Sequence, residues 1–182
     1  MNTEVVDMAF RDAHTEYTAL LAAFQSIQIG SVDVEGHPDV SYAPSVLDDS
    51  GNFYVFVSEL SKHTENLLKQ GRASVMLIED EGVAAQIFAR KRVTFECEAQ
   101  SVAREHADWT DTIERFGEKF GRVVDHLKKM DDFHLIRLHP KAGRLVVGFG
   151  KAYDVSGERM EQLAHVGGFT EQGHRPVAHK NS

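Results

Sequence analysis

Three β-rich segments follow one another early in the chain, and only tight turns separate them. The segments are "SIQIGSVDV" (26–34), "DVSYAPSVL" (39–47) and "FYVFVSE" (53–59), and the turns are "EGHP" and "DDSGN". Both turns are dense in turn-forming residues. Strands joined so closely pair antiparallel, because a parallel pair needs a crossover of roughly a dozen residues or more. This spacing disfavours a doubly wound parallel sheet and predicts an antiparallel barrel.

The rest of the chain adds helices and strands to this start. Apolar residues recur at helical spacing over 3–25 and over 104–130, where Gly117 and Gly121 are expected to divide the region into two helices. The segment 53–59 is apolar on both faces and is therefore expected to be buried on both. A short helix is predicted at about 61–70 and a helical turn at 82–88. Further strands are predicted at 73–80, 89–102, 133–140 and 143–155.

The charge of the chain narrows the classes of partner. Its formal net charge of −8 argues against a nucleic-acid binder, whose affinity comes largely from neutralising phosphates. The first residues carry acids and no long apolar run, so no signal peptide is predicted, and the stretch "ALLAAF" is too short to span a membrane. The single cysteine, Cys97, excludes an intrachain disulfide and fits a reducing compartment. The expectation is a soluble cytoplasmic protein with a structural cysteine.

Two arginines form the first candidate site. In "RKR", Arg90 and Arg92 are expected to share one face of a strand, on which alternate residues point the same way. Two neighbouring guanidinium groups suit a bidentate clamp on a carboxylate or a phosphate. The alternative is a solvated strand face on which they pair with Glu96 or Glu98.

A second candidate lies in "SELSKHTENL" (58–67), where a strand ends and a helix begins. The free N–H groups and the dipole of a helix N-terminus attract anions. Lys62 and His63 fall in the first turn, where cations are disfavoured unless a negative group lies beside them. The alternative is a surface turn in which His63 is merely solvated.

His174 stands between Gly173 and Arg175 in a glycine-rich tail. Glycine permits conformations closed to other residues, so a mobile arm could bring this imidazole to a metal or a cofactor. The alternative is a disordered terminus. Asp132 precedes a predicted strand and could accept a hydrogen bond from an imidazole N–H, which raises the basicity of that ligand. The alternative for Asp132 is that it merely ends a helix and starts a strand.

An ordered set of stretches completes the picture: "DVSYAP", "SELSKHTENL", "IEDEGVAAQIFARKRVTFECEA", "MDDFHLIRLHP", "VVGFGKAYDVSG" and "EQGHRP". Together they resemble the haem-utilisation and haem-degrading proteins of the HugZ/HutZ type. These proteins are a branch of the FMN-binding split-barrel superfamily, which is related to pyridoxamine 5'-phosphate oxidase. The resemblance covers almost the whole chain, and the ordered set is much rarer than any one stretch.

The resemblance implies a fold. It implies a mainly β protein with helices (α+β), an antiparallel Greek-key split β-barrel in residues 1–156 with an N-terminal helix and inserted helices. Residues 157–182 would form a flexible C-terminal tail that contains glycine and histidine. The family dimerises through its sheet, which implies a homodimer with sites at the subunit interface.

The resemblance also implies roles for single residues. His174 occupies the position of the family's haem-iron ligand, and Asp132 that of an acidic residue that polarises this ligand. Arg90 and Arg92 become candidates for the haem propionates, and His63 is implied to lie near the same groove as a second catalytic residue. The implied function is oxidative degradation of haem, with oxygen and an electron donor, which releases iron.

Two alternatives stay open. One is an FMN-dependent oxidoreductase, in which Lys62, Ser58 and the helix N-terminus hold the flavin phosphate. The flavin relatives typically carry Arg-Lys where this chain has Lys62 and His63, and often a glycine where Cys97 stands. Both departures count against tight flavin binding. The other alternative is a haem carrier or storage protein without turnover.

Overall fold

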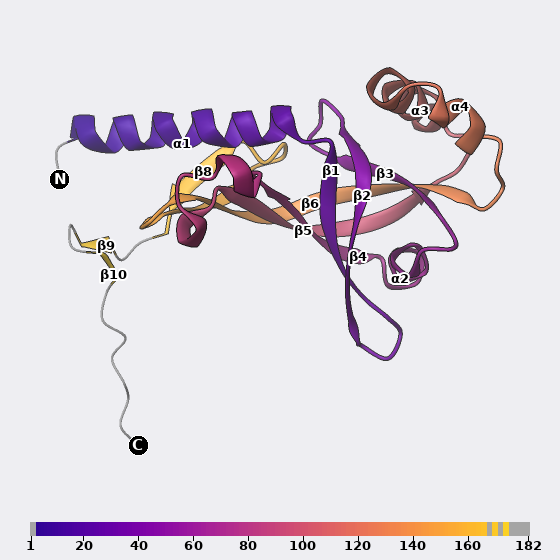
Figure 1. Cartoon of the computed structure of the whole chain (residues 1–182), viewed down its shortest axis with the longest axis horizontal. Coiled ribbons are helices and arrows are strands. Elements are labelled where there is room, and N and C mark those ends of the chain that lie inside the picture. Colours follow the sequence, from indigo (N-terminus) through magenta and orange to yellow (C-terminus); the bar gives the residue numbers. More distant parts are fainter. Residues whose placement is uncertain (1–2, 167–168, 171–172, 175–182) are drawn as a thin grey trace.

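The computed structural model describes residues 3–166, 169–170 and 173–174 (Figure 1). Six strands close into a barrel: β1 Ser26–Val32, β2 Pro38–Leu47, β3 Phe53–Ser58, β4 Arg72–Ile78, β5 Arg92–Val102 and β6 Phe133–Gly148. Their order is β3-β2-β1-β4-β5-β6, and β6 pairs back with β3 to complete the ring. All of these pairs are antiparallel, which confirms the predicted antiparallel split barrel.

Alternation along the strands builds the core inside the barrel. On β1, Ile27 and Ile29 are fully buried, whereas the residues on either side of each are partly exposed or polar. Successive side chains of a strand point to opposite faces, so one face of each strand fills the barrel. Phe53 and Phe95 meet there with ring centroids 5.4 Å apart. Cys97 is buried on the same face of β5, and burial raises its pKa to about 12, as suits a structural residue.

A second apolar cluster lies outside the barrel wall, under helices α3 (Ala107–Phe120) and α4 (Val123–Leu127). Tyr54 and Phe56 of β3 point into this cluster, where Phe56 and Phe116 have ring centroids 6.3 Å apart. The burial of apolar area on both sides stabilises β3 as a central element of the sheet. The prediction that this strand is buried on both faces is therefore confirmed.

The break between α3 and α4 falls at Gly121. This residue has φ 76°, in the region that favours glycine, and its N–H donates to the Gly117 carbonyl. The predicted break at Gly121 is confirmed, whereas a break at Gly117 is wrong because α3 continues through that residue.

Two further helices pack on the inner core. α1 (Thr3–Ala23) contributes Ala13 and Tyr17 to the core, and α2 (Lys62–Gln70) contributes Leu67. Figure 1 shows α1 lying along one side of the sheet and α2 at the other end of the molecule. Among the described residues, no helix has the length and apolar character needed to cross a membrane.

β6 differs from the prediction of separate strands at 133–140 and 143–155. A turn between them is wrong, because β6 runs through that point without a break. The β5–β6 ladder shifts register between Glu96 and Cys97, which makes Lys141 the extra residue of a β-bulge. Residues typical of a turn thus mark an irregularity inside one long strand.

The sheet extends beyond the barrel. β7 (Lys151–Ser156) pairs with β6, and β8 (Gln162–His165) pairs with β7, so paired strands continue past residue 156, where the tail is predicted to begin. β9 (Phe169–Thr170) and β10 (Gly173–His174) form a separate antiparallel pair. The division into barrel and tail stays a prediction, because much of the tail lies outside the described residues: 167–168, 171–172 and 175–182.

Candidate functional site

Ser58 and Asp132 lie together where β3 ends and β6 begins. Cross-strand pairing places Ser58 opposite Phe133. The Ser58 hydroxyl donates a hydrogen bond of 2.6 Å to Asp132 Oδ2, and the backbone N–H of Glu59 donates to the Asp132 carbonyl at 2.9 Å. Both Ser58 and Asp132 are half-buried. Two residues that the sequence offers as separate candidates therefore form one unit.

His63 lies in the first turn of α2, shortly after this unit in the sequence. Its side chain is 6% exposed, so the alternative of a solvated surface histidine is wrong. Nε2 is buried, and no described residue forms a hydrogen bond with it. Burial lowers the pKa of His63, against the opposing effect of the Asp39 charge, so the ring is neutral at pH 7. Nε2 is therefore an unsatisfied polar atom in the interior of the described structure.

Lys62 precedes His63 at the start of α2. Its Nζ lies 3.6 Å from Asp33 Oδ2, which is the negative neighbour expected for a cation in the first turn of a helix. Ser61 occupies the N-cap position in extended conformation, although its side chain makes no capping hydrogen bond. Lys62 is therefore held near the helix N-terminus by the β1–β2 turn.

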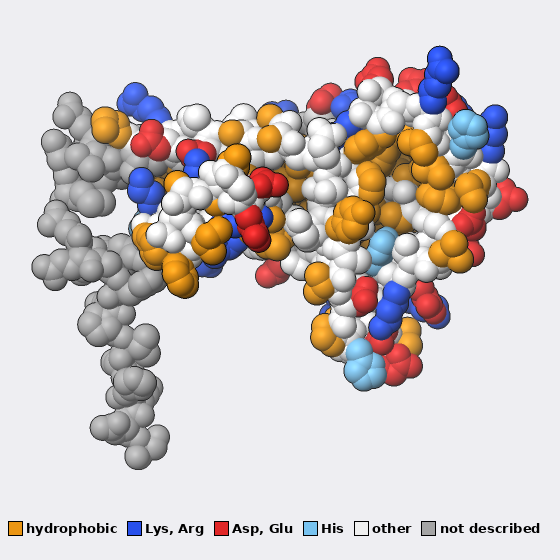
Figure 2. Space-filling view, viewed as in Figure 1, with side chains coloured by type: hydrophobic (Ala, Val, Ile, Leu, Met, Phe, Trp, Pro, Cys, Tyr) orange, Lys and Arg blue, Asp and Glu red, His pale blue; other side chains and the backbone are white. Residues whose placement is uncertain are grey.

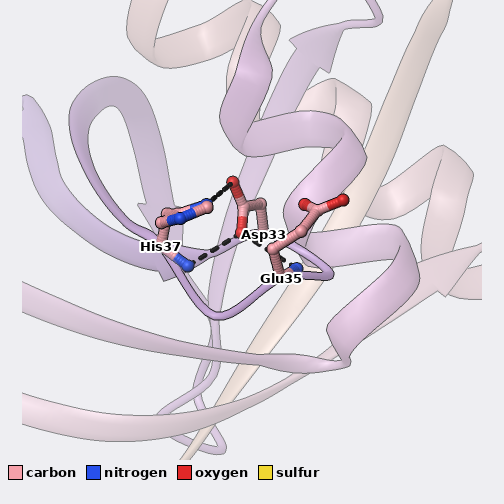
Figure 3. Close-up of side chains that lie close together, drawn as sticks. All are labelled: Asp33, Glu35 and His37. Atoms are coloured by element: carbon pink, nitrogen blue, oxygen red, sulfur yellow. Dashed lines mark hydrogen bonds and ion pairs between the residues drawn. The ribbon is translucent and has the colours of Figure 1, made fainter.

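That turn contains a cluster that the sequence reasoning missed. Asp33, Glu35 and His37 have ligand atoms within 4.8 Å of one another, and Figure 3 shows the carboxylate of Asp33 between the other two residues. Asp33 Oδ1 accepts from the backbone N–H groups of Glu35 and His37, and Oδ2 lies 3.2 Å from His37 Nδ1. The sequence signal is the alternation D-x-E-x-H. The hydrogen bonds of Asp33 close the turn, which gives the cluster a structural role.

Arg90 and Arg92 do not share a strand face, so that prediction is wrong. Arg90 directly follows the 3₁₀ helix η2 (Ile87–Ala89), and β5 begins only at Arg92. Arg90 Nε donates to the Glu79 carbonyl, and Nη1 pairs with Glu81 Oε1 at 2.7 Å, in place of the predicted Glu96 or Glu98. With these contacts to Glu79 and Glu81, Arg90 lies outside β5. Arg92 Nη1 donates to the Arg90 carbonyl at 2.9 Å.

The two groups of candidates lie at opposite ends of β6. Arg92 pairs with Val146 near the end of β6, whereas Ser58 pairs with Phe133 at its start. Thirteen strand steps separate Phe133 from Val146, which is roughly 43 Å along the strand at about 3.3 Å per residue. Figure 1 shows β6 crossing the molecule between these two ends. The structure brings Ser58, Asp132, Lys62 and His63 toward one end, and the two arginines to the other.

The tail that carries His174 leaves from the end with the arginines. Val166, just after β8, donates its N–H to the Ala152 carbonyl beside the β6–β7 turn. Figure 1 shows β8, β9 and β10 on the side of the molecule away from α3 and α4. The structure describes the backbone of His174, in β10, but not its side chain. The role of His174 as an iron ligand therefore stays a prediction.

The class of protein is defined by three features together. They are the closed antiparallel barrel, the helix that starts beside the end of β3, and the residues gathered there. The chain belongs to the pyridoxamine 5'-phosphate oxidase family, whose sequence profile matches residues 13–147. The predicted superfamily is therefore confirmed.

Individual relatives narrow the class. The chain is 42% identical over 154 residues to the heme oxygenase HutZ of Vibrio cholerae serotype O1, and the match covers 85% of each chain. A crystal structure of HutZ from Vibrio cholerae, described as a heme storage protein, is 39% identical with a TM-score of 0.67, over 70% of this chain and 89% of that one. Campylobacter jejuni ChuZ is 30% identical with a TM-score of 0.74, over 92% of this chain and 64% of that one. The resemblance to HugZ/HutZ-type proteins is confirmed.

Proposed function

We propose that this protein binds haem and opens its ring oxidatively, with oxygen and an electron donor, so that iron is released. Its 42% identity to a relative named heme oxygenase HutZ supports this function. The observation that carries it is the half-buried carboxylate of Asp132, which Ser58 holds through Oδ2. An oriented carboxylate suits a metal-bound imidazole as a partner, since it accepts the imidazole N–H and raises the basicity of the ligand.

The residues present fit haem as the ligand. A carboxylate accepts at two oxygens, so Asp132 would keep a position for the N–H of His174, the proposed iron ligand. Arg92 has five N–H donors, and the described residues use one of them, in the bond from Nη1 to the Arg90 carbonyl. It can therefore also bind a propionate. Arg90 remains a weaker candidate, because Glu81 already occupies its guanidinium group.

The proposal includes a homodimer whose sites are shared between subunits. Asp132 lies at one end of β6, and the tail with His174 leaves from the other, so a second copy brings the two ends together. The outward side of β2 supplies an apolar face for this contact, because Val40 is 81% exposed and Tyr42 69% exposed. Figure 2 shows hydrophobic side chains over β1 and β2 on this side of the molecule. Beside this face, the small residues Gly30 and Ser74 help to line an open groove of about 480 Å³.

Haem supplies the chemistry of oxygen activation when it is bound. The chain supplies the groups that bind and orient the haem. His174 would hold the iron, Asp132 would accept the ring N–H of His174, and Arg92 would neutralise a propionate. Lys62 and His63 would line the same end of the partner barrel as Asp132. The neutral state of His63 at pH 7 suits a donor or acceptor of one hydrogen bond, not a charge partner.

A second candidate function is haem storage without turnover, since a crystal structure of HutZ is described as that of a heme storage protein. An FMN-dependent reaction is less well supported. The hydroxyl of Ser58, one of its proposed phosphate contacts, is committed to Asp132.

A haem titration of the wild type and of His174→Ala tests the proposal. The wild type should saturate at one haem per subunit, and the variant should lose the absorption spectrum of the axial ligand. Ascorbate in air then separates degradation from storage, because a storage complex keeps its spectrum. Equal and poor haem binding by both proteins, with a yellow flavin chromophore, would instead favour the FMN-dependent reaction.

A further inference from the structure

The hydroxyl of Ser58 has a fixed direction. The backbone N–H of Leu60 donates to Ser58 Oγ at 3.1 Å, so the hydroxyl acts there as an acceptor. A serine hydroxyl has a single proton, and the short contact of 2.6 Å commits that proton to Asp132 Oδ2. A hydrogen bond to a carboxylate is charge-assisted and stronger than one between neutral groups.

The backbone around Ser58 holds the hydroxyl in place. Ser58 pairs with Phe133 in the β3–β6 ladder, and Glu59 N–H donates to the Asp132 carbonyl at 2.9 Å. The carbonyl of Ser58 accepts from Ser61 N–H and from Thr64 Oγ1, at 3.1 and 2.7 Å. Contacts from both strands and from α2 therefore set the position of one hydroxyl relative to one carboxylate.

A carboxylate bound by one hydroxyl cannot rotate freely about its bond to the chain. The bond from Ser58 to Oδ2 restrains this rotation, and Oδ1 is the oxygen that no described residue binds. The neighbouring acid on the same turn, Glu59, is already paired with His134, at 2.7 Å from Oε1 to Nε2. Of Glu59 and Asp132, it is therefore Asp132 whose carboxylate can accept from an external donor.

We propose that Ser58 is a positioning residue that aims the carboxylate of Asp132 at the imidazole of His174 from a second copy. This inference rests on the proposed function and gives Ser58 a different role from that of a flavin-phosphate contact. Without the Ser58 hydroxyl, the carboxylate turns toward solvent and its hydrogen bond to the imidazole weakens. The imidazole then donates less electron density to iron, as expected when an outer partner of a metal ligand is lost.

The experiment compares Ser58→Ala with Ser58→Thr, Asp132→Asn and Thr64→Val, each as the full chain loaded with haem. Thr64→Val is the matched control. It removes another hydrogen bond to Ser58, at the carbonyl, which keeps Ser61 N–H as a donor, and it leaves the Asp132 carboxylate untouched. The readouts are the iron–imidazole stretching frequency of the ferrous complex, by resonance Raman spectroscopy, and the dissociation constant of haem.

Ser58→Ala should lower the stretching frequency toward the value of Asp132→Asn and weaken haem binding about tenfold, the lower end of the usual effect of an outer-shell substitution. Ser58→Thr, which keeps the hydroxyl, should restore both, and Thr64→Val should match the wild type. A wild-type frequency in Ser58→Ala overturns the inference. An equal shift in Thr64→Val overturns the inference as well, because the shift then comes from a general disturbance of the turn and not from loss of the Ser58 hydroxyl.

Failure of the proposed function has a different signature. If the band survives in His174→Ala, His174 is not the ligand, and the proposed function and this inference fall together. If the band is lost in His174→Ala but unmoved in Ser58→Ala, only the role of Ser58 falls. Should Ser58→Ala fail to fold, Ser58→Cys carries the same comparison, since a thiol is of similar size and donates weakly.

Discussion

A dimer that mixes two variants tests whether the haem site is shared between subunits. One copy carries Asp132→Asn and keeps His174, and the other carries His174→Ala and keeps Asp132. In a symmetric dimer each interface contact occurs twice, with the roles of the copies exchanged. If the site is shared, one of the two sites holds both native residues and the other holds neither. If each chain builds its own site, both sites are damaged.

The dimensions of the chain favour the shared site. Through β7, His165 of β8 lies level with Leu145 of β6. Twelve strand steps separate Leu145 from Phe133, which is roughly 40 Å along β6 at about 3.3 Å per residue. Nine residues lead from His165 to His174, and a fully extended chain spans at most roughly 32 Å over that length. Measured along the strand, the tail falls short of the far end of its own barrel.

The assay isolates the mixed dimer with two different affinity tags and titrates it with haem. The readout is the iron–imidazole stretching frequency, and a shared site predicts the wild-type value in the mixed dimer, because its single His174 meets a native Asp132 of the other copy. The control pairs a wild-type copy with a copy that carries both Asp132→Asn and His174→Ala. In this control a shared site leaves no intact pair, whereas a site within one chain leaves one. A wild-type frequency in the control and the lowered frequency of Asp132→Asn in the mixed dimer would refute the shared site.

Three contacts of the fold give further predictions. Tyr17→Phe leaves the buried Met160 carbonyl without its donor at 2.9 Å, and urea unfolding should show a loss of about 1–3 kcal/mol. Gly143→Ala places Cβ 2.8 Å from Phe95 Cδ1 and should cost about 1–3 kcal/mol by overpacking; an unchanged melting temperature would contradict this packing. Burial lowers the pKa of His63 below 6.5, so the unfolded chain binds more protons than the folded one as pH falls through that value. The free energy of unfolding should therefore fall as the pH drops below 6.5. In urea titrations on both sides of that pH, His63→Gln should show a smaller change in this free energy than the wild type.

Local signals in the sequence were sufficient for most of the barrel. The short turns before and after 39–47 required antiparallel pairing, and the apolar run 53–59 required cover on both faces. The long strand β6 escaped prediction because Pro140 and Gly143, which usually mark turns, here flank a bulge. The continuity of the strand is visible only in its hydrogen-bonded ladder with β5. Pairing between segments far apart in the chain produces no pattern in the local sequence.

The candidate residues were predictable by type but not by position. Arg90 leaves the strand because the Glu79 carbonyl and the Glu81 carboxylate hold its guanidinium group, and spacing carries no trace of such contacts. The contact between Ser58 and Asp132 depends on the pairing of β3 with β6, which closes the barrel between segments far apart in the sequence. Neither contact has a periodic signature.

The separation along β6 changes what the candidate residues mean together. Asp132 lies at the start of β6, whereas Val166, the last described residue before the tail, lies beside the other end of that strand. A carboxylate that polarises an imidazole needs that ligand within hydrogen-bond reach. In the proposed two-fold dimer both pairs would meet at once, and Arg92 at the tail end would receive a propionate. On this reasoning the proposed dimer is part of the proposed haem site itself, and the apolar face of β2 would serve both assembly and haem binding.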